Sequence, residues 1–165
     1  MRAAGGGAPI NFPGPPDLRG LDPRQSYNAT SLAFLGDAVW ELFWRSESFY
    51  PPRPAGEMHR RAKHASRAET QCGLHALLRG AGVLTDGEQD VLRWGRNASV
   101  RPPRGLERRV YSDATAVECL VGYLWLTDPG RLREVLSWAF AHVGSVPGAG
   151  GAGEPAGAPG PASGG

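Results

Sequence analysis

The stretch LAFLGDAVWELFW, residues 32–44, is apolar on nearly every side when it is wound as an α-helix. At about 100° per residue, one stripe of the helix is filled by apolar side chains, and aromatic side chains cover most of the rest: Leu32, Leu35, Val39, Leu42 and Phe43 form the stripe, flanked by Phe34, Trp40 and Trp44. The sequence predicts a helix over about residues 29–46, with Asn28, Thr30 or Ser31 as its N-cap. Asp37 stands inside this helix, where a charged group is costly.

A second stretch, ATAVECLVGYLWL at residues 114–126, is apolar in the same way, and Glu118 is its only carboxylate. An isolated buried carboxylate is strongly destabilising, or its pKa rises until it is neutral, unless a cation lies nearby. Two such acids indicate that Asp37 and Glu118 share a cation. Mg²⁺ fits because one or two carboxylates, waters and substrate phosphate commonly hold it. The alternative is a structural role, with arginines or backbone donors satisfying both acids.

Glycines accompany both acids. Gly36 precedes Asp37, and Gly122 lies one turn after Glu118. A glycine inside a helix costs about 1 kcal/mol relative to alanine, so it is usually kept where another helix or a ligand approaches closely. We therefore expect the two helices to cross at these glycines, which would bring Asp37 and Glu118 together. Ordinary helix packing without chemistry is the alternative.

The remaining periodic segments are also helical, and none alternates as a strand would. We expect an all-α fold of five helices, over about residues 29–46, 56–78, 85–97, 106–126 and from 129 onward. A capping box of Thr85 and Glu88 would start the third helix. Pro129 suits the first turn of the last one.

Glycine and proline are concentrated at the two ends of the chain. Of 165 residues, 24 are Gly and 15 are Pro. Segments of this composition bury too little apolar surface to offset the entropy of ordering. We expect a flexible leader over residues 1–25, one folded domain, which would carry the active site, over residues 26–143 and a disordered tail over residues 144–165.

Several classes of protein are excluded by composition. No apolar run is long enough to span a membrane, and no membrane partner is expected. Cys72 and Cys119 form neither a disulfide framework nor a zinc site. The first residues do not show the charged and then apolar pattern of a secretory leader, so none is expected. These features favour a reducing compartment.

The basic residues are unevenly distributed, although the net charge is only +2. Six arginines fall within residues 93–109, and a second basic cluster contains Arg60, Arg61, Lys63 and Arg67, interleaved with His59 and His64. Of the 18 basic residues all but one are Arg, whose planar fork suits phosphate. This pattern favours a nucleic-acid partner. A GC-rich genome that encodes Arg in preference to Lys is the alternative.

The segments around Asp37 and Glu118 resemble the two signature helices of the ribonuclease III catalytic domain. The resemblance is stronger to the short branch of that family, Mini-ribonuclease III, than to the full-length enzymes. MHRRA at residues 58–62, with Gln71 further on, and GRNA at residues 95–98 resemble two intermediate segments of the same branch. The resemblance covers about residues 27–141. It implies the ribonuclease III endonuclease fold without a separate domain for double-stranded RNA.

The resemblance also implies an activity and a set of residues for it. The protein would be a Mg²⁺-dependent endoribonuclease, with Mn²⁺ as a substitute, that hydrolyses double-stranded RNA to 5′-phosphate and 3′-hydroxyl ends. Asp37 and Glu118 would be the catalytic and metal-binding residues. RNA would be contacted by residues of the two basic segments: His59, Arg60, Arg61, Arg96 and Asn97.

The resemblance further implies a precursor of 23S ribosomal RNA as the substrate and a homodimer as the active form. Because dimer interfaces are enriched in aromatic residues, Trp40 and Trp44 are expected to be exposed and to form the interface.

The chain departs from the full-length enzymes at two positions. Those enzymes carry two further acids where this chain has Ala33 and Thr115, and the short branch also lacks them. The nearest remaining acids are Glu41 and Asp113, which we expect to act on the site through water or through a neighbouring group. The alternatives are an ion pair between Glu41 and Arg45 at i,i+4, and a solvated Asp113.

Two other functions remain open from the sequence. One is a catalytically inactive RNA-binding structural protein of the same fold, although such a lineage would be expected to lose one of the two acids. The other is a helical protein-interaction domain whose arginines only keep it in solution. The compartment is also open, between a chloroplast stroma and a bacterial cytoplasm.

Overall fold

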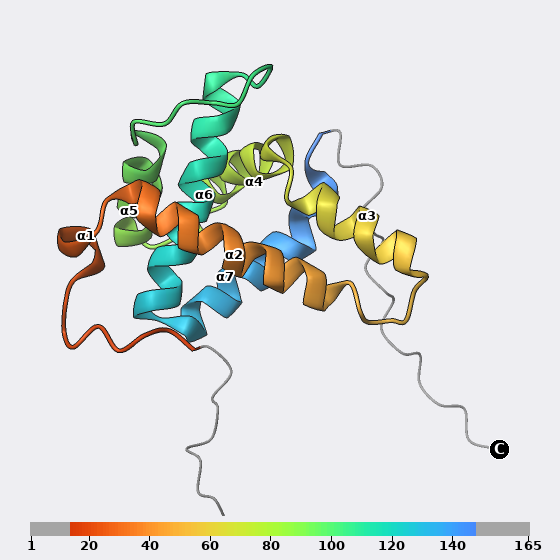
Figure 1. The fold of residues 1–165 in the computed structure, drawn as a ribbon, viewed down its shortest axis with the longest axis horizontal. Coiled ribbons are helices and arrows are strands. Elements are labelled where there is room, and N and C mark those ends of the chain that lie inside the picture. The colour runs from red at the N-terminus through yellow and green to blue at the C-terminus, as the bar shows by residue number, and fades with distance from the viewer. Residues whose placement is uncertain (1–13, 148–165) are drawn as a thin grey trace, which may run out of the picture.

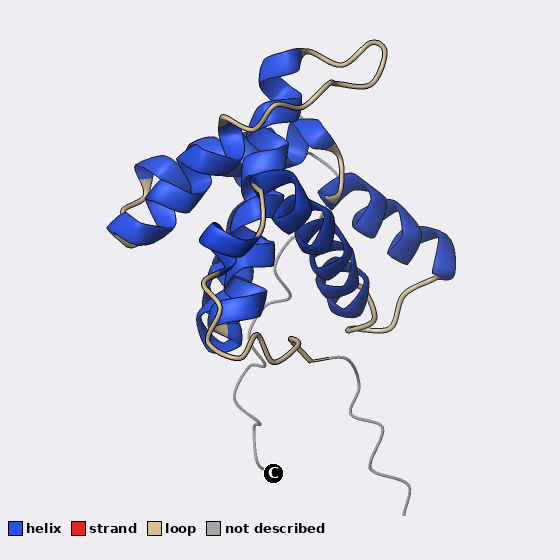
Figure 2. Ribbon diagram, turned by 60° about the vertical axis from the view of Figure 1, so that its left-hand side comes forward, coloured by secondary structure: helices blue, strands red, loops and turns tan. Residues whose placement is uncertain are grey.

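The computed structural model describes residues 14–147 of the chain. Over this range it contains seven α-helices and one short 3₁₀ helix, and no strand (Figures 1 and 2): α1 (Pro23–Ser26), α2 (Ala29–Glu47), α3 (Ala55–Ala65), α4 (Ala68–Gly80), α5 (Asp86–Arg96), α6 (Arg108–Thr127), α7 (Pro129–His142) and η1 (Val143–Ser145). The prediction of an all-α fold is confirmed.

Helix α6 is the centre of the fold because its sequence from Ala114 to Leu126 is apolar on nearly every side. Helices α2, α4 and α5 pack around it, and α7 covers its C-terminal part (Figure 1). Its buried residues include Val117, Leu120 and Val121, which contribute to one core with Leu32 of α2 and Leu74 of α4. A helix without a polar face needs neighbours on every side, and these helices supply them.

Helices α2 and α6 cross at the two glycines that the sequence singled out. A Cβ atom on Gly36 would lie 1.8 Å from the carbonyl oxygen of Glu118, and one on Gly122 would lie 2.0 Å from the carbonyl oxygen of Leu32. Any larger side chain at either position would force the backbones apart. The predicted crossing is confirmed.

The predicted helix starts also form. Asn28 caps α2 by accepting a hydrogen bond from the backbone N–H of Ser31 at 2.7 Å. Thr85 and Glu88 make the reciprocal capping box that starts α5. Pro129 occupies the first turn of α7. These ends rest on local contacts, which the sequence determines directly.

The helix expected over residues 56–78 is wrong, because two helices, α3 and α4, occupy this stretch. They are separated at Ser66 and Arg67, and Arg67 has extended backbone. No glycine or proline lies at this break; its cause is packing, since α3 lies against α2 while α4 lies against α6. Trp40 stabilises the end of α3 by donating a hydrogen bond from Nε1 to the carbonyl of Ala65 at 3.1 Å.

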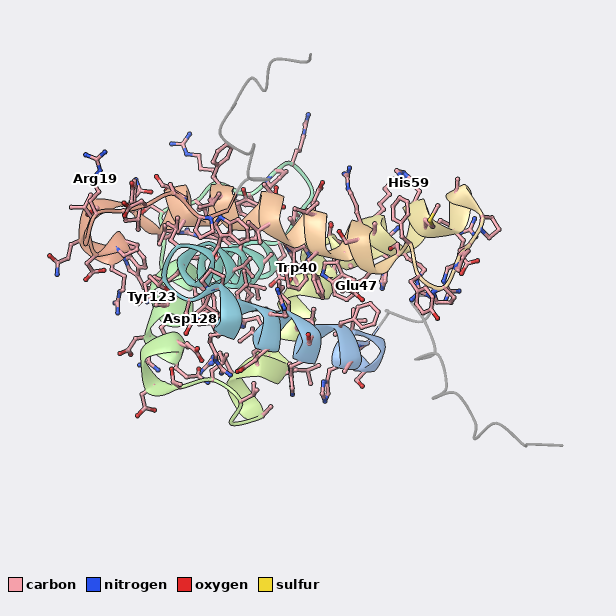
Figure 3. All side chains as sticks on the ribbon, turned by 90° about the horizontal axis from the view of Figure 1, so that it is seen from below. Arg19, Trp40, Glu47, His59, Tyr123 and Asp128 are labelled. Atoms are coloured by element: carbon pink, nitrogen blue, oxygen red, sulfur yellow. The ribbon has the colours of Figure 1, made fainter. Side chains whose placement is uncertain are left out.

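The exposure expected for Trp40 and Trp44 is also wrong. They are only 1% and 4% exposed, and Trp44 packs against Phe140 of α7 with ring centroids 5.3 Å apart. Figure 3 shows Trp40 on the inner side of α2. The exposed apolar side chains of α2 are instead Phe34, at 85%, and Leu42.

Residues 1–13 and 148–165, which contain most of the expected leader and tail, lie outside the described range. Inside it, α1 is capped by Asp22, and Arg24 lies over the ring of Trp94. Val146 is buried, so core packing continues past residue 143. No helix in the described part is both long enough and apolar enough to span a membrane.

Candidate active site

Asp37 and Glu118 lie where α2 and α6 cross. Gly36 packs against the backbone carbonyl of Glu118, and Asp37 is the next residue along α2. The two side chains are near enough for the charge of Asp37 to raise the pKa of Glu118. The structure therefore brings this predicted pair together at the place that the glycines indicated.

Glu118 occupies surroundings that disfavour its charged form. Burial raises the pKa of its carboxyl to about 7, and the negative charge of Asp37 acts in the same direction. Gln71, a fully buried residue of α4, acts in the opposite direction. The Nε2 atom of Gln71 has no hydrogen-bond partner among the described residues, so this amide compensates the carboxylate only weakly.

Asp37 lies on the exposed side of the same crossing. Partial burial raises the pKa of its carboxyl, and the charge of Glu41 one turn further along α2 adds to the effect. Within residues 14–147, neither Asp37 nor Glu118 forms an ion pair with a basic side chain. Among the described residues, therefore, no basic side chain pairs with either of these two neighbouring acids.

The pair fits a hard divalent cation. No group of three or more His, Cys, Asp or Glu side chains gathers as a metal site in the described part of the chain. Mg²⁺ does not require one, because one or two carboxylates plus waters and substrate phosphates usually hold it. A divalent ion between Asp37 and Glu118 would supply the missing charge and would favour the ionised form of both.

Glu41 and Arg45 form the ion pair that was the alternative to a role of Glu41 through water. Glu41 Oε2 lies 2.6 Å from Arg45 Nη2, one helical turn away, and both side chains are partly exposed. Its charge also reaches Asp37, as the raised pKa of Asp37 shows. Glu41 is therefore an acidic neighbour of the pair whose charge Arg45 partly compensates.

A groove on the described surface lies beside Glu41, and neither Asp37 nor Glu118 lines it. This groove, of about 700 Å³, separates the C-terminal part of α2 from α3; it is lined by Glu41, Arg45, Ser48, Phe49, Met58, His59, Ala62, Lys63, Ser66 and Arg67. Of the predicted RNA-binding residues of α3, His59 lines the groove, and Figure 3 shows it on the outer part of that helix. Arg60 and Arg61 lie on the same helix outside the groove.

Arg96 and Asn97, at the end of α5, lie in a different place. They line a smaller pocket with the first turn of α6. Asp113 lies beneath it and is only 5% exposed, so the alternative of a solvated Asp113 is wrong. Its partner across the helices is Arg96, at 2.5 Å.

The position of Gln71 beside Glu118 was not predicted, although Gln71 contributed to the resemblance. A signal for it exists in the sequence. Gln71, Leu74 and Leu78 recur at helical spacing and are all buried on one face of α4. A polar side chain within an apolar stripe indicates a buried polar partner, but the pattern does not say which one.

The Ribonuclease III domain family matches residues 30–129 of the chain. Among curated proteins, Mini-ribonuclease 3 of Synechocystis sp. is 42% identical over 113 residues, which are 68% of this chain and 78% of that protein. Mini-ribonuclease 3 of Gloeobacter violaceus is 43% identical over 118 residues, which are 70% and 86% of the two chains.

The fold also occurs among solved structures. The crystal structure of protein FN1578 from Fusobacterium nucleatum superposes with a TM-score of 0.64, at 21% identity, over 73% of this chain and 98% of that one. The fold is therefore that of the ribonuclease III domain, and the family match and the relatives define the class of enzyme as an endoribonuclease. The chain belongs to the ribonuclease III family, within its Mini-ribonuclease 3 branch.

Proposed function

We propose that this endoribonuclease hydrolyses double-stranded RNA with Mg²⁺ held by Asp37 and Glu118. The observation that carries the proposal is the partly buried Glu118, which lies beside Asp37 and has no cationic partner within residues 14–147. A protein that kept this acid for stability alone would pair it with a base. A site that must receive a cation leaves it unpaired.

The residues of the chain have separate tasks in the reaction. When bound, Mg²⁺ supplies a Lewis acid at the scissile phosphate and lowers the pKa of the attacking water. Glu118, on the most buried helix, and Asp37, on the exposed side of α2, are the residues that would hold the ion. Water oxygen bonds to phosphorus while the bond to the 3′ oxygen breaks, which leaves a 5′-phosphate and a 3′-hydroxyl. Mn²⁺ is expected to substitute because it accepts the same oxygen ligands.

The RNA would be held by basic residues on two sides of the crossing. His59, Arg60 and Arg61 lie on α3, and Arg96 and Asn97 lie at the end of α5. Contacts from such side chains to phosphates position a duplex without reading its sequence. An A-form duplex is recognised in this way, through its shape and backbone. A precursor of 23S ribosomal RNA is the substrate that the family resemblance favours.

The active form that we propose is a homodimer. Phe34, Ala38 and Leu42 are exposed along one side of α2, at helical spacing, beside Asp37. Exposed apolar stripes of this kind mark protein interaction surfaces. Two copies joined there would place two pairs of acids on one duplex. The compartment that suits this proposal is a bacterial cytoplasm or a chloroplast stroma, since the curated relatives include cyanobacterial proteins.

Substitution of each acid tests the proposed chemistry. Asp37→Asn and Glu118→Gln should each abolish Mg²⁺-dependent cleavage of a duplex RNA, while binding of the same duplex in EDTA persists. Glu134→Gln, which removes an exposed acid of α7, is the matched control and should cleave normally. Cleavage by the Glu118→Gln protein at the wild-type rate would contradict the metal site. A wild-type protein that binds the duplex but never cuts it would favour the inactive RNA-binding alternative.

A further inference from the structure

A buried acid lies beneath the basic surface where α5 meets α6. Asp113 Oδ1 accepts a hydrogen bond from Arg96 Nε at 2.5 Å, and Asp113 Oδ2 lies 3.6 Å from Arg109 Nη1. From α4, Cys72 Sγ lies 3.5 Å from Oδ2 and His75 Nδ1 lies 3.7 Å from Oδ1. One carboxylate therefore connects three helices and contacts two arginines.

Both arginines reach this carboxylate from the surface. The side chains of Arg96 and Arg109 are 41% and 59% exposed, while the side chain of Asp113 is only 6% exposed. Arginine carries five N–H donors, and the hydrogen bond to Asp113 uses Nε of Arg96. The terminal nitrogens of Arg96 remain for another acceptor. A buried acid that anchors exposed arginines fixes where their free donors lie.

These donors border an open pocket of about 380 Å³. Its lining contains three guanidinium groups, an amide and a hydroxyl, and no carboxylate: Arg96, Asn97, Ala98, Arg108, Arg109 and Ser112. Glu107 at the rim pairs with Arg109 at 3.4 Å, but both side chains are exposed, and such pairs contribute little. Helix α6 also begins here without a side-chain cap, so its first N–H groups add to the positive field.

We propose that this pocket binds a backbone phosphate of the RNA and that Asp113 is a positioning residue, holding Arg96 and Arg109 at the rim. The inference rests on the proposed function and extends it, because it assigns Arg108, Arg109 and Ser112 to substrate binding. Asn97 and Ala98 line the pocket at the start of the loop that joins α5 to α6. Figure 1 shows this loop at one end of α6. That loop carries two further exposed arginines, Arg101 and Arg104. A phosphate within a chain of phosphates matches this extended basic surface better than a small isolated anion does.

The Asp113→Asn protein gives a test with an unusual sign. Removing a negative charge from an RNA-binding surface should tighten binding if the acid only repels phosphate. If Asp113 positions Arg96 and Arg109, the same substitution should weaken binding, by roughly five- to tenfold for a lost charge-assisted contact. The measurement is fluorescence anisotropy of a short blunt RNA duplex in EDTA, at several salt concentrations. Binding that is unchanged or tighter in a folded Asp113→Asn protein would overturn the proposal.

Substitutions at the surface keep the proposal testable even where the Asp113→Asn protein does not fold. Arg108→Ala and Arg109→Ala remove exposed side chains, and each should weaken duplex binding severalfold and reduce the salt slope by about one. Arg133→Ala removes the same charge from an exposed position on α7 and is the matched control. Equal losses of affinity in the Arg109→Ala and Arg133→Ala proteins would overturn the pocket and leave only a general effect of charge.

Asp113→Asn, tested with and without the two arginines, separates a positioning role of Asp113 from a role in stability alone. Asp113→Asn should cost little further affinity in an Arg96→Ala, Arg109→Ala background, because the arginines through which it acts are gone. In Mg²⁺, the Asp113→Asn protein should show a raised KM for the duplex with kcat retained. If these substitutions weaken duplex binding as predicted but the wild-type protein does not cleave the duplex, only the proposed function is contradicted. Normal cleavage together with unchanged binding in the Asp113→Asn protein would contradict the pocket alone.

Discussion

Glu88 and Glu118 are both glutamates turned toward the interior, and they differ in what surrounds them. Glu88, 6% exposed, receives Arg131 in a bidentate pair at 2.8 and 3.0 Å. Burial raises the pKa of Glu88, but the hydrogen bonds from Arg131 and Thr85 outweigh it, so the pKa is lowered. Glu118 has no such base within the described residues, and its pKa is raised to about 7. The two acids therefore differ in their charge partner rather than in burial alone, and this difference is what separates the structural role of Glu88 from the role proposed for Glu118.

The pair at Glu88 is a structural junction. Arg131 Nη2 also donates to the carbonyl of Val83 at 2.6 Å, so Arg131 joins α7 to the start of α5. Glu88 completes the capping box with Thr85. All partners of this acid are inside the protein. Glu118 has no basic partner within residues 14–147, and a divalent cation would supply the missing positive charge.

The largest effect that separates the two acids is on catalysis. Glu118→Gln should lower kcat for duplex cleavage by at least about 10³-fold, since a metal-bound transition state is stabilised by several kcal/mol. Glu88→Gln should leave kcat per folded molecule within about threefold. Single-turnover cleavage at a temperature where both proteins are folded measures this difference. Similar losses in the two proteins would mean that the acids differ less than the structure indicates.

The next effect is on stability, where the surroundings of Glu88 rather than those of Glu118 have the larger effect. Arg131→Ala leaves Glu88 buried without a base and should cost about 3–5 kcal/mol of unfolding free energy, as for other broken buried pairs. Arg133→Ala, on the same helix and exposed, should change it by less than about 0.5 kcal/mol. Urea unfolding checks both values. If the Arg131→Ala protein is as stable as the wild type, Glu88 is not held in the way described.

The glycines beside the two acids should also respond differently. Gly36→Ala would place Cβ against the Glu118 carbonyl, so we expect a loss of about 3 kcal/mol or more. Gly87→Ala, next to Glu88, meets nothing within 4 Å and should stabilise α5 by about 0.5–1 kcal/mol. Thermal unfolding of the two proteins provides the comparison. A tolerated Gly36→Ala substitution would contradict the close crossing of α2 and α6.

The smallest effect is on the pH dependence of stability. An unfolded glutamate ionises near 4.5, whereas Glu118 in the folded protein holds its proton up to about pH 7. Stability should therefore fall as pH rises through this window, by up to about 3 kcal/mol in the absence of metal, and level off above it. Glu118→Gln should remove this fall. Glu88 acts in the other sense, because its lowered pKa stabilises the folded state at neutral pH and that contribution is lost on acidification.

Urea titrations in EDTA at about pH 5 and about pH 8 measure that dependence. The quantity to compare is the change in unfolding free energy between the two pH values, in the wild type and in the Glu118→Gln protein. An identical change in both would assign the pH dependence to other groups.

Much of this comparison could be predicted from the sequence where the cause is local. The capping box of Thr85 and Glu88 depends on neighbours in the chain. The crossing at Gly36 and Gly122 could be predicted because a glycine inside an apolar helix usually lies where a second backbone packs closely. The isolation of Asp37 and Glu118 among apolar residues also predicts a shared cation, and this stays a prediction.

The remaining features depend on contacts between distant residues. Helical periodicity gives the stripe on which a side chain lies, but not its partner on another helix. The break at Ser66, the burial of Trp40 and the pairing of Glu88 with Arg131 each depend on contacts between different helices. Asp113 is the clearest case, because its solvated and buried positions are equally compatible with its place five residues before Glu118.

Mg²⁺ titration followed by unfolding tests the central difference between the two acids most directly. A ligand that binds only the folded state raises its stability in proportion to the logarithm of the ligand concentration. At a pH above 7, we predict that Mg²⁺ stabilises the wild type and the Glu88→Gln protein by equal increments and leaves the Glu118→Gln protein unchanged. An equal rise in stability in the Glu118→Gln protein would contradict the account, since the ion would then bind elsewhere.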